Sequence, residues 1–182
     1  MNILACDRQI QSVLRQCGQQ IQSLVLQQFA IEQKGPGDYV TDIDRLLDRQ
    51  LAAAFQEMFP HDGAITEENA RSRKLFHESY SRLWLIDPLD GTEDFIQGEQ
   101  SYAVMVGLLQ DAQPSAGWIY APATDTLYAG GTGWGCGRFK ERMPDNRSRR
   151  FLPSVPRSPL QCFWGIKTRR ILERRSPKSY QS

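Results

Sequence analysis

The chain has 182 residues, a length that predicts one ordinary domain with its own core rather than two independent ones. Hydrophobic residues make up 40% of it, charged residues 24%, and the formal net charge is +1, a balance that excludes an intrinsically disordered or membrane-embedded chain. The small net charge hides an asymmetry, because residues 139–182 hold 12 Lys and Arg against 3 Asp and Glu, whereas residues 1–138 hold 10 against 18.

Two amphipathic helices are predicted in the first 60 residues. From Leu4 to Phe29 the apolar residues recur with helical spacing, so a long helix is expected there. Gly35, Pro36 and Gly37 then favour an exposed loop. A second helical stripe runs over residues 43–58 and ends before Pro60.

After the second helix the hydrophobic pattern becomes that of strands. Short runs of β-branched and aromatic residues predict strands over residues 64–66, 83–86, 102–109, 115–121 and 126–130. Short polar links join the last three runs, which favours an antiparallel meander. The predicted fold class for residues 1–138 is therefore α+β, with two long helices followed by a mainly antiparallel sheet.

Residues 139–182 have a different composition. They are basic, rich in Arg, Ser and Pro, and show no sustained hydrophobic period. We therefore predict a boundary near residue 138, followed by a segment that is either disordered or the product of a frameshift. Nucleic acid is not expected as a partner, since the aromatic and glycine pattern of a known binding module is missing.

The cysteines and the start of the chain indicate a cytoplasmic protein. Cys6, Cys17, Cys136 and Cys162 form no C-x-x-C pair, so neither a zinc knuckle nor a redox motif is indicated, and free thiols are the simplest interpretation. No signal peptide is expected, because no basic segment precedes an apolar run. No apolar stretch has the length that a bilayer span needs, so no membrane partner is expected.

The most informative stretch is WLIDPLDGTEDF, residues 84–95. An apolar run leads into Asp87 and Asp90, whose carboxylates are hard oxygen ligands suited to Mg²⁺. Gly91 allows the backbone to approach a phosphate, and amides at the start of a helix can bind an anion. Taken alone, D-P-x-D-G is also the composition of a surface turn, and that alternative stays open for the isolated motif.

Two further acidic segments precede this stretch. Glu67 and Glu68 follow the predicted strand at residues 64–66, although two adjacent Glu residues are by themselves usually solvent-exposed. Thr41 and Asp44 have the spacing of a capping box at the start of the second helix, and capping is the better interpretation of that pair alone.

The three segments GDYVTDID, ITEEN and WLIDPLDGTEDF resemble, in that order, the motifs of the inositol monophosphatase superfamily. The resemblance covers about residues 1–135 and implies the amino-terminal part of a layered αβαβα phosphatase fold. It implies a magnesium-dependent phosphoric monoester hydrolase whose partner is a small phosphorylated metabolite. A homodimer is also implied, because dimers are usual among the inositol enzymes.

The resemblance also assigns metal ligands. Glu67, Asp87 and the carbonyl oxygen of Leu89 would hold a first Mg²⁺ ion, and Asp90 would hold a second. Glu68, which lies beside the first ligand, would be an auxiliary residue, because such neighbours orient the ligands.

Catalytic and phosphate-binding roles follow from the same resemblance. Asp44 and Thr92 would orient the attacking water, and Glu67 would be catalytic through the ion that it holds. The amides of Gly91 and Thr92 would bind the phosphate. The implied reaction is direct in-line attack of water on a phosphate monoester, without a covalent phosphoenzyme.

The substrate within the superfamily is less constrained. The segment TEDFIQGEQSYAV resembles the 3′(2′),5′-bisphosphate nucleotidases more than the inositol enzymes, so the prediction leans to bisphosphate nucleotides, with inositol 1-phosphate as the alternative. Members of the family supply a further Asp from a late W-D-x-x-A-G-like motif, and nothing in this sequence matches it. A truncated, catalytically inactive metal-binding remnant is therefore a further alternative.

Overall fold

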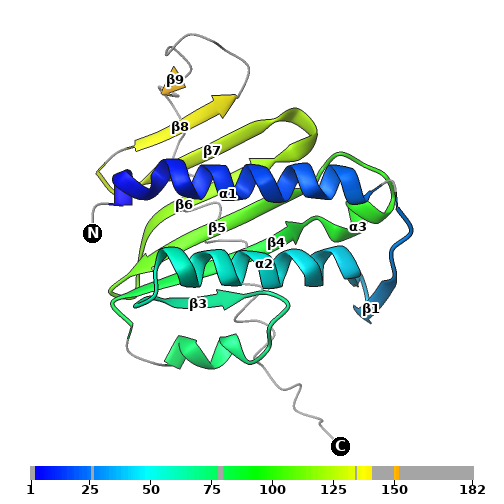
Figure 1. Cartoon of the computed structure of the whole chain (residues 1–182), viewed down its shortest axis with the longest axis horizontal. Coiled ribbons are helices and arrows are strands. Elements are labelled where there is room, and N and C mark those ends of the chain that lie inside the picture. Colours follow the sequence, from blue (N-terminus) through cyan, green and yellow to red (C-terminus); the bar gives the residue numbers. More distant parts are fainter. Residues whose placement is uncertain (1–2, 26, 78–79, 134, 141–149, 152–182) are drawn as a thin grey trace, which may run out of the picture.

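The computed structural model describes residues 3–25, 27–77, 80–133, 135–140 and 150–151. Two long helices, α1 (Ile3–Leu24) and α2 (Asp42–Met58), lie side by side across one face of a sheet (Figure 1). All but one of the neighbouring strand pairs in that sheet are antiparallel. The predicted α+β fold, two long helices followed by a mainly antiparallel sheet, is confirmed.

Helix α1 is amphipathic, and its apolar stripe faces the sheet. Ile10, Leu14 and Ile21 on this stripe are fully buried. The helix ends at Leu24, so the prediction that it continues to Phe29 was wrong. Phe29 lies in the connection after the helix, where its ring packs against that of Phe95 with the ring centroids 5.5 Å apart.

Helix α2 begins with the predicted capping box. Thr41 is the residue that caps the helix: its hydroxyl accepts a hydrogen bond from the Asp44 amide at 3.3 Å, and its own amide donates to the Asp44 carboxylate at 2.8 Å. This reciprocal pair satisfies two amides that the first turn would otherwise leave without partners. The helix ends at Met58, directly before Phe59, whose ring stacks on Trp84 at 4.5 Å.

The segment between the two helices is a β-hairpin, and its turn at residues 36–37 lies where a loop was predicted. Strand β1 (Ile31–Gly35) pairs antiparallel with β2 (Asp38–Thr41), and Gly37 takes a positive φ of 66° in the turn. The two strands were not predicted. Four of the five β1 residues are exposed, so that strand has no alternating apolar pattern to reveal it.

Seven strands form the main sheet among the described residues, in the order β3-β4-β5-β6-β7-β8-β9. Their bounds are Gly63–Thr66, Arg82–Asp90, Ala103–Gln110, Gln113–Ala121, Thr126–Gly131, Gly135–Lys140 and Arg150–Phe151. The predicted meander is confirmed, because β5, β6 and β7 pair in sequence order and antiparallel. The short helices are η1 (Ser72–His77), α3 (Thr92–Ile96) and η2 (Pro122–Thr124).

The predicted boundary at residue 138 falls inside strand β8. This strand continues to Lys140 and pairs with β9 at residues 150–151. Residues 141–149 and 152–182, which make up most of the predicted basic segment, lie outside the described residues. The proposed division of the chain there stays a prediction.

The sheet has a hydrophobic cluster on each face. The larger cluster packs α1 and α2 against inward residues such as Trp84, Trp118 and Leu127. The smaller cluster lies on the opposite face and contains residues of β3, β4 and β5, namely Ile65, Leu83, Leu85, Met105 and Leu109. Successive residues of β4 therefore point to one cluster or the other, and this alternation decides on which face its acidic residues lie.

Two further predictions concern the described residues. Cys6, Cys17 and Cys136 are thiols outside any disulfide, as predicted, and Cys162 lies outside the described residues. In the part of the chain that the structure describes, no helix combines the length and apolar character needed to cross a membrane.

Candidate functional site

Asp87 and Asp90 lie on the same face of the sheet because of a bulge in strand β4. Asp87 pairs with Met105 and Asp90 with Ala103, so three steps along β4 match two steps along β5. Residues three apart in a regular strand point to opposite faces, and one extra residue restores the alternation. Since opposed residues of an antiparallel pair share a face, both carboxylates lie on the side of Met105, away from α1 and α2.

Glu67 lies beside Asp87 at the ends of two parallel strands. Thr66 pairs with Ile86 at the end of the β3–β4 ladder, and the Glu67 amide donates to the Ile86 carbonyl at 3.1 Å. The ladder thereby continues one step, to Glu67 and Asp87. Neighbouring strands are about 4.8 Å apart, so carboxylates at this level can reach a common ion.

The turn after Asp87 is held by local hydrogen bonds. The Leu89 amide donates to Asp87 Oδ1 at 3.1 Å, and the Leu89 carbonyl accepts the Thr92 hydroxyl at 2.9 Å. A carbonyl oxygen has two lone pairs, so the Leu89 oxygen has the capacity for two partners. The bulge therefore presents a backbone oxygen next to the two aspartates.

Thr92 and Asp44 meet, although they are 48 residues apart in the sequence. Thr92 Oγ1 lies 2.9 Å from Asp44 Oδ1, and Asp44 is almost fully buried. Burial raises the pKa of the Asp44 carboxyl, while hydrogen bonds from Thr41 and Thr92 lower it and leave a net upward shift. The structure thus joins the predicted water-orienting pair, and Thr41 supports it by a further hydrogen bond from its hydroxyl to Asp44 Oδ2.

Glu68 is held by the β1–β2 hairpin. Lys34 Nζ donates to both Glu68 carboxylate oxygens, at 2.8 Å and 3.0 Å, and lies 3.7 Å from Asp38. Burial raises the pKa of Glu68, Lys34 lowers it, and the charges of Glu67 and Asp44 raise it. These electrostatic couplings show that Glu68 shares one acidic environment with the predicted ligand and the predicted water-orienting residue.

Gly91 is required by the backbone at this point. It takes a positive φ of 85°, and a Cβ atom there would lie 2.5 Å from the carbonyl oxygen of Ser101. Both the conformation and the close approach exclude larger residues. Gly91 is thus needed for the turn from β4 into α3, whatever its amide binds.

Three residues that support the site were not predicted from the sequence: Lys34, Asp48 and Arg73. Asp48 is one helical turn after Asp44, and this i,i+4 spacing could have placed both carboxylates on one face of α2. Arg73 donates to the Glu67 carbonyl at 2.8 Å. Neither Lys34 nor Arg73 lies in a recognisable motif, so nothing in the sequence pattern could have identified them.

The donor set suits Mg²⁺. The predicted ligands are carboxylates and a backbone carbonyl, which are the hard oxygen donors that this ion prefers. Within the described residues no group of three or more His, Cys, Asp and Glu side chains could hold a metal ion. The set predicted for the first ion is smaller than such a group, since it takes two side chains, Glu67 and Asp87, and completes them with the Leu89 carbonyl.

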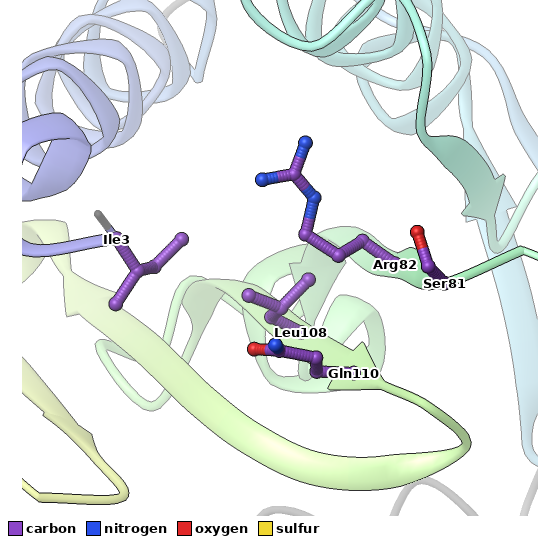
Figure 2. Close-up of a pocket in the computed structure, with 5 residues that line it drawn as sticks. All are labelled: Ile3, Ser81, Arg82, Leu108 and Gln110. Atoms are coloured by element: carbon purple, nitrogen blue, oxygen red, sulfur yellow. The ribbon is translucent and has the colours of Figure 1, made fainter. Parts of the chain in front are cut away.

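A pocket of about 270 Å³ lies at the other end of β4. Figure 2 shows its lining: Ser81 and Arg82 at the start of β4, Leu108 and Gln110 on β5, and Ile3 on α1. The Arg82 guanidinium donates to Asp62 Oδ1 at 2.9 Å and 2.7 Å. The charge of this arginine is therefore matched within the fold, and the pocket is separate from the acidic site.

Comparison with known proteins agrees with the motifs. The family model described as "Inositol monophosphatase family" matches residues 4–174. An inositol-1-monophosphatase of Mesorhizobium japonicum is 37% identical over 124 residues, which are 68% of this chain and 44% of that protein. The 3′(2′),5′-bisphosphate nucleotidase CysQ of Haemophilus influenzae is 29% identical over 120 residues, 66% of this chain and 45% of that protein.

Solved structures share the fold. An IMPase of Thermotoga maritima has a TM-score of 0.64 and 28% identity, and the match covers 75% of this chain and 53% of that one. The SuhB protein of Bartonella henselae has a TM-score of 0.67 and 23% identity, covering 93% and 67%. The chain spans about half the length of the curated relatives it matches. By its family model, its motifs and its fold, the chain belongs to the inositol monophosphatase family.

Proposed function

We propose that this chain carries the metal site of a magnesium-dependent phosphomonoesterase that acts on small phosphorylated metabolites. The observation that supports this most strongly is the strand register, in which the β4 bulge and the β3–β4 ladder bring Asp87, Asp90 and Glu67 to one end of the sheet. The Thr92–Asp44 hydrogen bond lies at the same end.

The predicted ligands divide between two ions. Glu67, Asp87 and the Leu89 carbonyl would hold the first Mg²⁺, and Asp90 would hold the second. When bound, Mg²⁺ supplies Lewis-acid chemistry and stabilises the charge that develops on phosphoryl oxygens. The amides of Gly91 and Thr92 would bind the phosphate.

Asp44 and Thr92 perform the proton chemistry in this proposal. Thr92 donates its hydroxyl proton to Asp44 and accepts a hydrogen bond from water, which directs a water lone pair at phosphorus. As the water oxygen bonds to phosphorus, the bond from phosphorus to the alcohol oxygen breaks. The water proton passes to Thr92 Oγ1, the Thr92 proton passes to Asp44, and the departing alkoxide takes a proton from solvent water. The raised pKa of Asp44 makes that carboxylate a better proton acceptor.

Two substrate classes are proposed. The loop after α3, with its QGEQS sequence at exposed residues 97–101, supports 3′(2′),5′-bisphosphate nucleotides, as does the likeness to CysQ. Inositol 1-phosphate is the second candidate, supported by the 37% identity to an inositol-1-monophosphatase. Cytoplasmic location and homodimer formation are further parts of the proposal, and light scattering on the purified protein tests the dimer.

Phosphate release from the purified chain tests the proposed activity. Adenosine 3′,5′-bisphosphate and inositol 1-phosphate are assayed with Mg²⁺ and with EDTA, and turnover is expected only with Mg²⁺. Glu67→Gln and Asp90→Asn should each abolish most turnover while circular dichroism stays unchanged. Each substitution replaces a negatively charged ligand by a neutral amide of nearly the same size. Retained turnover in either variant would remove that residue from the metal site.

The ratio of the two rates decides between the substrate classes. Faster release from the bisphosphate nucleotide supports the first class, and faster release from inositol 1-phosphate supports the second. Saturable Mg²⁺ binding without turnover of either compound would instead support a catalytically inactive metal-binding remnant.

A further inference from the structure

Asp48 is a buried carboxylate whose two oxygens are both hydrogen-bonded. It lies on α2 with 4% of its surface exposed. Its Oδ2 accepts the Thr66 hydroxyl at 2.8 Å, and its Oδ1 accepts the Glu68 amide at 3.0 Å. Burying a carboxylate costs free energy unless hydrogen bonds compensate it, and here each oxygen accepts one.

The two hydrogen bonds fall on either side of Glu67, one on the residue before it and one on the residue after it. The Glu67 backbone is hydrogen-bonded on both sides: its amide donates to the Ile86 carbonyl and its carbonyl accepts from Arg73. The segment from Thr66 to Glu68 is thereby pinned to α2, β4 and η1 together. A ligand side chain on a segment held in this way has its Cα position determined before an ion arrives.

Helix α2 also carries Asp44, one turn before Asp48. Asp44 contacts Thr92 at the start of α3, whereas Asp48 contacts the end of β3. One rigid helix therefore sets the spacing between the water-orienting pair and the segment that bears Glu67. This spacing matters for metal binding. Mutating a residue that holds a metal ligand in place commonly lowers metal affinity by about 10- to 100-fold.

We propose that Asp48 is a positioning residue, which holds the Thr66–Glu68 segment so that Glu67 is oriented toward the metal ion. The proposal rests on the proposed function in one respect, since it takes Glu67 to be a magnesium ligand. Asp48 itself touches neither the ion nor the substrate.

The test compares Asp48→Ala, Asp48→Asn and a matched control, Asp7→Ala. Asp7 is also 4% exposed and also accepts two side-chain hydrogen bonds, from Trp118 and Gln11, but it lies on α1. Mg²⁺ affinity is measured by titration calorimetry, and hydrogen exchange of residues 66–68 by mass spectrometry. Thermal unfolding of each variant records its loss of stability.

Asp48→Ala should weaken Mg²⁺ binding by about 10- to 100-fold and speed exchange at residues 66–68. Asp7→Ala should lose stability as well but keep the wild-type affinity. Asp48→Asn should recover most of the affinity, because its amide oxygen can still accept from Glu68 and its NH₂ can donate to the Thr66 hydroxyl.

The two proposals fail in different ways. If wild-type protein binds Mg²⁺ and Asp48→Ala binds it equally well, or if Asp7→Ala weakens binding as much, the positioning role is wrong and the metal site stands. If the wild-type chain shows no saturable binding, the metal site is wrong, and the role of Asp48 in orienting a ligand falls with it.

Discussion

The Thr92 hydroxyl has one proton and two acceptors at equal distance, Asp44 Oδ1 and the Leu89 carbonyl, each at 2.9 Å. The single proton is shared by the two acceptors in a three-centre bond or donated to one of them at a time, so the hydroxyl can turn between the carboxylate and the bulge. Donation to Asp44 leaves the Thr92 oxygen with lone pairs for water. The proposed chemistry depends on this arrangement rather than on the bulk of the side chain.

Thr92→Val keeps the shape of the side chain and removes the hydroxyl. Phosphate release should fall by about 100-fold or more, the usual size of an acid–base contribution, whereas Thr92→Ser should retain most of the rate. The rates are compared on whichever substrate the wild-type chain hydrolyses. Equal rates for the valine variant and the wild type would exclude Thr92 from the proton chemistry.

Cys17 gives a prediction about stability and pH. Burial raises the pKa of its thiol from 9.0 to about 12. Between these values the unfolded thiol loses its proton while the folded one keeps it, so stability falls as pH rises above about 9. Urea unfolding at pH 8 and pH 10.5 should show a larger loss for wild type than for Cys17→Ala, which has no thiol to titrate. The same loss in both proteins would contradict the buried, protonated thiol.

Most residues of the candidate site could be predicted from the sequence, but the residues that hold them in place could not. Asp87, Asp90 and Glu67 stand in short ordered motifs, which made them recognisable. Asp48 acts through the amide of Glu68, 20 residues away, and Arg73 through the carbonyl of Glu67, six residues away. Both contacts exist only once α2, β3 and η1 have packed. No local pattern records such contacts.

At the scale of elements, the helices and the central strands were predictable because they bury apolar residues. In α1 and α2 these residues recur with the helical period, whereas β4 and β5 are buried on both faces and show short continuous apolar runs. Strand β1 is exposed along most of its length and leaves no such trace. The parallel pairing of β3 with β4 was also not predicted, since register between distant strands depends on the packed sheet.

The packing of α1 on the sheet rests on a glycine. A Cβ atom at Gly18 would lie 2.3 Å from Tyr120 Cε1 and 2.8 Å from Pro122 Cγ. The Tyr120 hydroxyl is 3.1 Å from Asp125, which limits how far the ring can move. The helix and the sheet therefore approach each other too closely for any side chain at this position.

Gly18→Ala should cost about 1–3 kcal/mol of unfolding free energy, as overpacking usually does, despite the better helix propensity of alanine. Gln16→Ala on the exposed face of α1 is the control and should be nearly neutral. Urea unfolding of both variants measures the difference. If Gly18→Ala were as stable as wild type, α1 would not pack on β6 at this distance.

At the scale of the whole molecule, the acidic site is assembled from both layers. The sheet supplies Asp87 and Asp90 through a bulge and Glu67 through a parallel pair, while α2 supplies Asp44 from the layer above. These elements come from the described part of the chain, which spans about half the length of its curated relatives. The metal-binding half of the proposed chemistry can therefore be tested separately from turnover.

Titration calorimetry of the purified chain with Mg²⁺ tests the central claim most directly. Asp87 is the residue to substitute, because it is buried near the end of β4, where it lies beside Glu67 on the neighbouring strand end. Wild-type protein should show saturable binding, and Asp87→Asn should bind at least about tenfold more weakly with unchanged circular dichroism. The absence of saturable binding to wild type, or equal affinity in the variant, would contradict the proposed metal site.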